Sequence, residues 1–126
     1  MKVTVRVVRL RIGSSGYEAV DITENVREVV KGLGLINGVV VTHTPSKYCL
    51  VTMIEYEPEL LADLEEFMSK CGSVSGLAEA LVGKSVVAPV VNNDLALGTF
   101  KRLVFIDLSR SKGEKEVVVA LEGTFK

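Results

Sequence analysis

Few side chains in this sequence could hold a metal ion. The chain has one histidine, His43, and two cysteines, Cys49 and Cys71. A catalytic zinc ion takes about three protein ligands, drawn from histidine, cysteine and carboxylate side chains, and keeps one position open. His43, Cys49 and Cys71 lack the local spacing of a metal motif, and free cysteines are commonly small buried hydrophobic residues. We therefore predict no metal site and no cofactor. We expect His43 to be a surface or packing residue, because no nucleophile or acid is recognisable beside it.

One carboxylate could take part in acid–base chemistry. Glu55 precedes a predicted helix that begins near Pro58. A carboxyl group against an apolar wall can act as a general acid or base, but a carboxylate near a helix N-terminus also stabilises the helix. Both interpretations of Glu55 stay open. We expect Asp63 to be a solvated or capping residue on that helix, and Thr99 to stabilise a turn after Gly98.

The composition excludes several classes of protein. The 126 residues carry 15 Lys and Arg against 16 Asp and Glu, which gives a formal net charge of −1. Binding to a nucleic acid depends largely on neutralising phosphates with basic side chains, so this balance argues against a nucleic-acid partner. No apolar stretch approaches the roughly 20 residues that cross a bilayer, so we expect no membrane partner. Two cysteines are too few for a disulfide scaffold, and no secretion signal opens the chain, which predicts a cytoplasmic protein.

The length and residue usage add two expectations. A chain of this length can bury an ordinary hydrophobic core as one domain over residues 1–126. The sequence has no glutamine and is rich in valine. That composition is typical of proteins from thermophiles.

The first half of the chain predicts four strands and a helix. Residues 2–12 alternate between apolar and polar types, and residues 17–20 can return as a second strand after a Ser-Ser-Gly turn, so we expect the two to pair as a hairpin. Apolar residues with helical spacing follow from Thr23, with Asp21 or Thr23 available as a cap and Gly34 as the stop. Asn37-Gly38 predicts a turn into a strand over residues 39–42, and residues 47–54 form another strand after Pro45.

The second half predicts two helices and three strands. Pro58 suits the first turn of a helix whose apolar stripe contains Leu60, Leu61, Leu64, Phe67 and Met68, and which Gly72 ends. Residues 75–82 predict a short helix, and residues 85–91, 100–108 and 116–122 predict strands. The order of these elements favours an α+β fold, with two main helices and one short helix packed on a mainly antiparallel sheet.

Three ordered stretches of the sequence resemble the YjbQ-like family, whose members are often called secondary thiamine-phosphate synthases. They are DITENVRE at residues 21–28, residues 38–45 leading to EYEP and LLADL at 55–64, and LAEALVGKS at 77–85 followed by LALGTF at 95–100. The stretches are spaced along the chain from residue 21 to residue 100. The resemblance implies a compact α+β protein that forms a homotrimer.

The resemblance also implies that the metal site of the family is missing here. The family has a Pro-His-Thr-Thr stretch and an Asn-x-His-x-His stretch whose histidines resemble metal ligands. The corresponding positions of this chain are Ser46, Val74 and Gly76, and their side chains cannot replace imidazole. Four further positions differ from the family: Phe100 replaces tryptophan, Lys101 glutamine, Asp107 glutamate and Ser109 aspartate. Four agree with it: Glu55, Asp63, Gly98 and Thr99.

Two lysines stand at positions where the family has other residues. Lys47 lies where the family has threonine, and Lys101 where it has glutamine. An ammonium group can hold an anion that a metal ion would otherwise hold. The plainer interpretation is that both lysines are solvated residues at the rim of an inactive site.

These observations lead to one main functional hypothesis and two alternatives. The main hypothesis is a YjbQ-like protein that acts as a trimeric binding module for a phosphorylated or carboxylate small molecule, or for a protein, with Ser46, Lys47 and Thr99 as ligand-binding residues. The first alternative is a metal-independent enzyme with thiamine-phosphate-synthase-like activity, in which Glu55 and Lys101, or Glu55 and Lys47, are catalytic. The second alternative is a structural subunit that assembles with a metal-competent relative.

Overall fold

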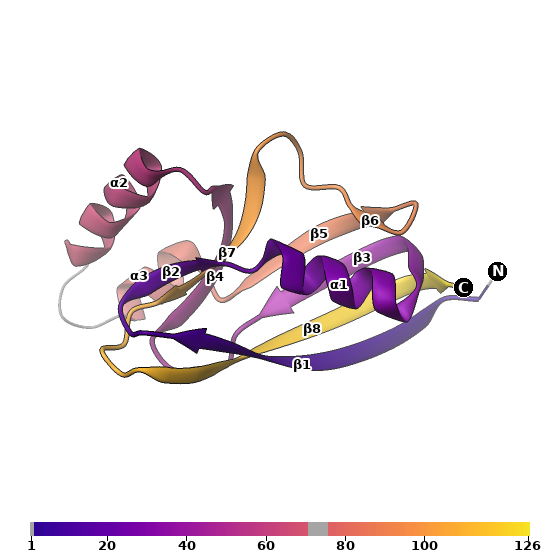
Figure 1. Cartoon of the computed structure of the whole chain (residues 1–126), viewed down its shortest axis with the longest axis horizontal. Coiled ribbons are helices and arrows are strands. Elements are labelled where there is room, and N and C mark those ends of the chain that lie inside the picture. Colours follow the sequence, from indigo (N-terminus) through magenta and orange to yellow (C-terminus); the bar gives the residue numbers. More distant parts are fainter. Residues whose placement is uncertain (1, 71–75) are drawn as a thin grey trace.

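The computed structural model describes residues 2–70 and 76–126 as eight strands and three helices (Figure 1). In chain order these elements are β1 (Thr4–Ser14), β2 (Glu18–Asp21), α1 (Thr23–Leu33), β3 (Leu35–His43), β4 (Cys49–Glu55), α2 (Pro58–Ser69), α3 (Gly76–Val82), β5 (Ser85–Val91), β6 (Asp94–Leu95), β7 (Lys101–Asp107) and β8 (Gly113–Phe125). Among the described residues, no helix combines the length and the apolar character needed to cross a membrane.

The strands form two antiparallel sheets rather than the single sheet that we predicted. One sheet has the order β1-β8-β3-β5-β6 and the other has the order β2-β7-β4. Helix α1 packs against the long strands of the first sheet, whereas α2 and α3 lie beside the second sheet (Figure 1). The α+β class, the antiparallel strands and the three helices are as predicted, but the division into two sheets is not.

The predicted hairpin between the first two strands is wrong. Strand β1 pairs with β8 over its whole length, from Thr4 opposite Gly123 to Ser14 opposite Gly113, whereas β2 pairs with β7 in the other sheet. The turn after Ser14 does occur, but it passes the chain from one sheet to the other. The reason is length: the 11 residues of β1 find a complete partner in β8 and would leave most of their backbone unpaired against the four-residue β2.

The predicted turn at Asn37-Gly38 is also wrong, because β3 continues through it. Gly38 lies opposite Gly123 of β8, next to a register shift between Leu35 and Asn37. A Cβ atom at Gly38 would lie 2.0 Å from the carbonyl oxygen of Glu122. Gly38 therefore allows a close approach of two strand backbones instead of forming a turn.

The helix boundaries follow the sequence signals closely. Helix α1 ends before Gly34, which has a left-handed φ of 77°, and the carboxylate of Asp21 accepts a hydrogen bond of 3.0 Å from the backbone N–H of Thr23. Pro58 is the first residue of α2, as predicted. The predicted end of α2 at Gly72 and the first residue of the predicted third helix, Ser75, lie outside the described residues.

Strand β7 is buried on both faces and separates two hydrophobic clusters. Leu103 and Phe105 point into the main cluster, which also contains residues of α1, β3, β5 and β8. Val104 and Ile106 point the other way, into a small cluster with Met68 of α2 and Ala78 of α3. Strand β7 is therefore packed from both sides. The short strand β6, which the sequence did not predict, pairs with β5 after a turn at Asn92 and Asn93.

Candidate functional site

The structure brings Glu55 and Lys101 together at one end of the three-stranded sheet. Glu55 is the last residue of β4, Lys101 is the first residue of β7, and the two are directly opposite in the antiparallel register. The Lys101 Nζ atom lies 3.8 Å from Glu55 Oε1, and the two side chains are 45% and 40% exposed. This is a loose ion pair, which in a solvated setting contributes about 1 kcal/mol or less. Both groups are therefore accessible to a ligand.

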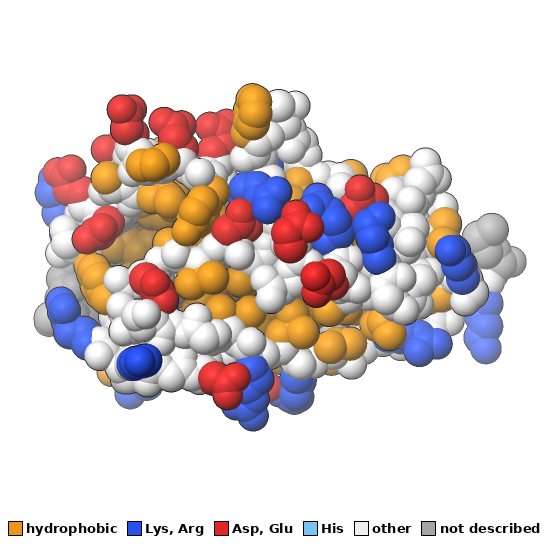
Figure 2. All heavy atoms as spheres, viewed as in Figure 1, with side chains coloured by type: hydrophobic (Ala, Val, Ile, Leu, Met, Phe, Trp, Pro, Cys, Tyr) orange, Lys and Arg blue, Asp and Glu red, His pale blue; other side chains and the backbone are white. Residues whose placement is uncertain are grey.

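Glu55 and Lys101 line a polar cleft of about 730 Å³. The other lining residues come from β2, α1, the turn after β4, β6, the loop before β7 and β7 itself. The lining residues are Asp21, Arg27, Glu55, Tyr56, Glu57, Leu95, Ala96, Leu97, Gly98, Phe100, Lys101 and Arg102. Figure 2 shows acidic and basic side chains interspersed on the surface above α1. The cleft is thus lined by both signs of charge.

The two arginines of the cleft are already held in ion pairs. Arg27 Nε lies 2.9 Å from Asp94 Oδ1 and its guanidinium also pairs with Glu24, while Arg102 Nε lies 2.8 Å from Asp21 Oδ2. Partial burial would raise the pKa of Asp21, but hydrogen bonds from Thr23 and Arg102 outweigh it and lower that pKa. Lys101, in contrast, has only the 3.8 Å contact with Glu55 among these ion pairs. Lys101 is therefore the cation of the cleft that is most available to an anion.

The loop before β7 has a constrained backbone. Gly98 and Phe100 have positive φ values of 96° and 62°, and the N–H of Lys101 donates a hydrogen bond of 3.3 Å to the carbonyl of Gly98. Phe100 is 78% exposed at the edge of the cleft. Thr99 lies in the turn between them and is exposed, but it is not among the residues that line the cleft.

Ser46 and Lys47 lie at the other end of β4 and do not reach the cleft. Seven residues of strand separate the two ends by about 20 Å. The Ser46 hydroxyl accepts a hydrogen bond of 2.9 Å from the N–H of Glu116, and its carbonyl accepts one of 2.9 Å from Lys84 Nζ. Lys47 Nζ lies over the ring of Tyr48, 5.0 Å from its centre. Within one chain, Ser46 therefore links the loop between β3 and β4 to Glu116 of β8 and to Lys84.

His43 and Cys49, the two candidate metal ligands that the structure describes, do not converge. His43 lies on the outer face of β3, where its Nδ1 is 2.5 Å from Ser85 Oγ, and Cys49 is buried in the core. Gly76 begins α3, whereas Val74 and Cys71 lie outside the described residues. Among residues 2–70 and 76–126, no three His, Cys, Asp or Glu side chains are grouped as a metal site requires.

The contact between His43 and Ser85 was not recognised in the sequence. Residues 43 and 85 are far apart in the chain but directly opposite each other on β3 and β5. The sequence prediction found no nucleophile beside His43, and this pairing supplies a hydroxyl there. Among the described residues, no acidic side chain hydrogen-bonds to His43, so the pair lacks the orienting acid of a catalytic triad.

Comparison with known proteins identifies the family of this chain. The profile of the family described as UPF0047 protein YjbQ-like matches residues 8–76. A UPF0047 protein of Archaeoglobus fulgidus is 31% identical over 118 aligned positions, which cover 82% of this chain and 91% of that protein. The chain belongs to the UPF0047 family. A second UPF0047 protein, from Methanothermobacter thermautotrophicus, is 26% identical and covers 91% of this chain and 90% of its own length.

Solved structures of similar proteins share the fold of this UPF0047 chain. A YbjQ-like protein of unknown function from Sulfolobus solfataricus matches with a TM-score of 0.86 at 22% identity, covering 98% of this chain and all of that one. A hypothetical protein from Aeropyrum pernix matches with a TM-score of 0.83 at 25% identity, covering 94% of this chain and 99% of that one. The predicted family membership and α+β fold are therefore confirmed.

This UPF0047 protein also contains a buried polar cluster that the sequence did not reveal. Asp107 is fully buried at the end of β7, and its carboxylate accepts hydrogen bonds of 2.7 Å from Ser14 Oγ and 2.8 Å from the N–H of Ser109. Lys115 Nζ lies 3.5 Å from the same carboxylate. Burial would raise the pKa of Asp107, but these hydrogen bonds and the lysine charge outweigh it, so the pKa is lowered. Asp107 is therefore ionised and satisfied inside the protein.

The same cluster makes Cys49 unreactive. The Cys49 thiol is 3.6 Å from Asp107 Oδ1, and burial together with that negative charge raises the pKa of the thiol to about 12. A thiol with this pKa supplies almost no thiolate at neutral pH, and the thiolate is the form that reacts or binds metal. Cys49 is therefore a structural residue.

Proposed function

We propose that this UPF0047 protein binds a small phosphorylated or carboxylate molecule in the polar cleft, without a metal ion. The observation that carries the proposal is the half-exposed ammonium of Lys101, loosely paired with Glu55 on the wall of a cleft of about 730 Å³. Exchanging a loose contact with one carboxylate for a direct contact with an anionic ligand costs little. A hydrogen bond to a charged group contributes about 1.5–3 kcal/mol.

Glu55 selects among the anions in this proposal. Its carboxylate repels a ligand that is anionic throughout, but it accepts a hydrogen bond from a hydroxyl or amine group. The ligand that fits therefore carries an anionic group for Lys101 and a hydrogen-bond donor for Glu55. Arg27 and Arg102 contribute positive potential to the cleft, although their guanidinium groups are already paired with Asp94 and Asp21. Thr99 remains a candidate contact from the turn beside Lys101.

Replacing Lys101 with alanine tests this site. We expect the affinity for pyrophosphate or for citrate, measured by titration calorimetry, to fall about tenfold in Lys101→Ala, which corresponds to about 1.4 kcal/mol. Lys47→Ala is the matched control, because Lys47 is an exposed lysine outside the cleft, and we expect its affinity to change by less than about twofold. Equal binding by Lys101→Ala and the parent protein would contradict the proposal, and an equal loss in both variants would point to a non-specific charge effect.

We further propose that the protein self-associates as a trimer through the outer face of the five-stranded sheet. Five valines of β1, β3 and β5 are between 39% and 61% exposed on that face: Val5, Val7, Val39, Val87 and Val91. None of the three helices covers them in the described part of the chain. Arg9 and Glu116 form an ion pair on the same face, so the surface offers both charges to an identical copy. An exposed apolar patch of this kind is typical of an interface rather than of a solvated surface, and in a closed ring of three copies two different parts of the patch would meet at each contact.

The mass of the protein in solution tests the assembly. Sedimentation equilibrium is expected to give three times the chain mass for the parent protein and a lower mass for Val87→Glu. Leu81→Glu is the control, because Leu81 is 61% exposed on α3, away from that sheet face. A monomeric parent protein, or loss of assembly in Leu81→Glu alone, would contradict this interface.

An enzyme is the alternative, and the contact between Glu55 and Lys101 is the observation that favours it. A carboxylate and an ammonium in one cleft can act as a base and as an electrostatic stabiliser of a developing anion. Growth rescue of a thiamine auxotroph that disappears with Glu55→Ala would favour a metal-independent thiamine-phosphate-synthase-like activity. Absence of rescue by the parent protein would favour the binding module.

A further inference from the structure

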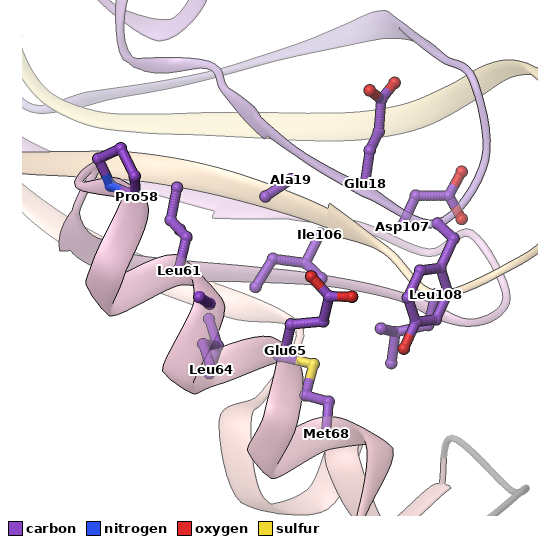
Figure 3. Close-up of a pocket in the computed structure, with 12 residues that line it drawn as sticks. Glu18, Ala19, Pro58, Leu61, Leu64, Glu65, Met68, Ile106, Asp107 and Leu108 are labelled. Carbon is purple, nitrogen blue, oxygen red and sulfur yellow. The ribbon is translucent and has the colours of Figure 1, made fainter.

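A second cavity lies between α2 and the three-stranded sheet, and it shares no residue with the polar cleft. Its volume is about 380 Å³. The cavity appears as a hollow with apolar side chains beside α2 (Figure 2), and Figure 3 shows its walls. The residues that line it are Tyr17, Glu18, Ala19, Pro58, Leu61, Ala62, Leu64, Glu65, Met68, Ile106, Asp107 and Leu108. Cavities of a few hundred Å³ with apolar walls are the usual size of small-molecule sites.

Helix α2 leaves its apolar side only half covered, and this cavity is the reason. The sequence predicted one apolar stripe along α2, and in the structure Met68 is the only buried residue of the helix. Leu61 and Leu64 are half-buried and line the cavity opposite Ile106 of β7. When an apolar ligand covers apolar surface that was in contact with water, the binding free energy becomes more favourable by about 25 cal/mol for each Å² covered. The cavity therefore favours an occupant with an apolar body.

The charged residues of the cavity are all acidic. Glu18, Glu65 and Asp107 line it, and no lysine or arginine is among its lining residues. Figure 3 shows Glu65 directing its carboxylate from α2 toward the sheet. Asp107 is already compensated by Lys115, and the nearby Arg110 lies over the ring of Tyr17. Glu65 has no ion-pair partner among the described residues. Glu18 points its carboxylate away from α2 (Figure 3) and accepts a hydrogen bond of 2.6 Å from the N–H of Ser15. The uncompensated negative charge that faces the cavity from α2 therefore resides on Glu65.

We propose that this cavity binds a small amphiphilic amine, with its apolar body between α2 and β7 and its ammonium group at Glu65. The two parts of the ligand follow from the two kinds of wall: Leu61, Leu64 and Ile106 for the apolar body, and Glu65 for the charge. A carboxylate ligand of the same shape is repelled by the same wall. The inference concerns a separate cavity and does not depend on the anion site.

Matched probes that differ only in their charged end test this inference. Tryptamine and indole-3-propionate carry the same ring system with opposite charges. We expect the parent protein to bind one tryptamine per chain, about tenfold more tightly than indole-3-propionate, as measured by titration calorimetry. Glu65→Gln is expected to remove this preference. Leu64→Ser is expected to weaken both probes.

Two controls make each outcome decisive. Glu59→Gln removes a carboxylate from the same helix outside the cavity, and Lys101→Ala changes only the polar cleft; both are expected to bind tryptamine like the parent protein. Far-ultraviolet circular dichroism establishes that each variant is folded. The inference is overturned if neither probe binds, if the two bind equally, or if Glu65→Gln keeps the preference for the amine. If a second copy of the chain filled the cavity, neither probe would bind at any protein concentration. That result would overturn the amine site.

Discussion

Gly123→Ala is expected to cost about 3 kcal/mol or more of the free energy of unfolding, because the new methyl group has no space. Gly123 lies opposite Gly38 where β8 and β3 approach most closely. A Cβ atom there would lie 2.1 Å from the carbonyl oxygen of Asn37 and 2.8 Å from the Cα atom of Gly38. Both neighbours are backbone atoms in the centre of the larger sheet. The strain can be relieved only by separating the two strands.

Urea unfolding at a fixed protein concentration measures this effect, and Gly32→Ala is its control. Gly32 lies in α1 with no atom within 4 Å of an added Cβ. Alanine there is expected to stabilise the protein by about 0.5–1 kcal/mol, because glycine is unfavourable inside a helix. If Gly123→Ala and Gly32→Ala changed stability equally, the close approach of β3 and β8 would be wrong.

Asp107→Asn is expected to cost about 3 kcal/mol at neutral pH, because it removes one partner of a buried charge pair. Lys115, whose side chain is only 13% exposed, would lose its carboxylate at 3.5 Å. The hydrogen bonds from Ser14 and Ser109 would also lose a charged acceptor. Such bonds are stronger than those to a neutral amide oxygen.

The pH dependence of this variant separates charge from packing. The pKa of Asp107 is lower in the folded protein than in the unfolded chain, so its contribution is fully present above about pH 4. It is lost as the pH falls through the folded value. The stability difference between the parent protein and Asp107→Asn is therefore expected to be largest at neutral pH and to shrink in acid. The contributions of Asp21 and Asp94, whose pKa values are also lowered, are common to both proteins and cancel.

Denaturant unfolding at neutral pH and at low pH measures that difference. Asp63→Asn, an exposed change on α2, is the control and is expected to change stability by less than about 0.5 kcal/mol. A difference that grows on acidification would show that Asp107 is not held as a carboxylate.

The sequence predicted local structure better than the pairing of strands. Gly34, Pro58 and the helical spacing of apolar residues are local signals, and the ends of α1 and the start of α2 follow them. Strand partners are chosen by length and by the faces that must be buried, which involve residues far apart in the chain. The 11-residue match of β1 with β8 therefore prevailed over the nearby turn.

The same distinction applies to the candidate sites. Glu55 and Lys101 were both singled out in the sequence, and the register of β4 with β7 brings them into contact. Ser46 and Lys47 were expected to bind the same ligand, but they lie at the opposite end of β4. The cluster around Asp107 and the cavity beside α2 were missed, because each combines residues from distant segments. The apolar stripe of α2 was recognised in the sequence, but of its five residues only Met68 is buried in the structure, and Leu61, Leu64 and Met68 line the cavity.

A crystal structure of the protein, from crystals grown in the presence of pyrophosphate, tests the central claim most directly. The claim is that this UPF0047 protein binds an anion through Lys101 in the polar cleft, without a metal ion. We expect the electron density of pyrophosphate in the polar cleft, with a phosphate oxygen within hydrogen-bonding distance of Lys101 Nζ. Two results would contradict this claim. One is a divalent metal ion coordinated in that cleft, and the other is pyrophosphate bound only elsewhere while Lys101 still faces Glu55.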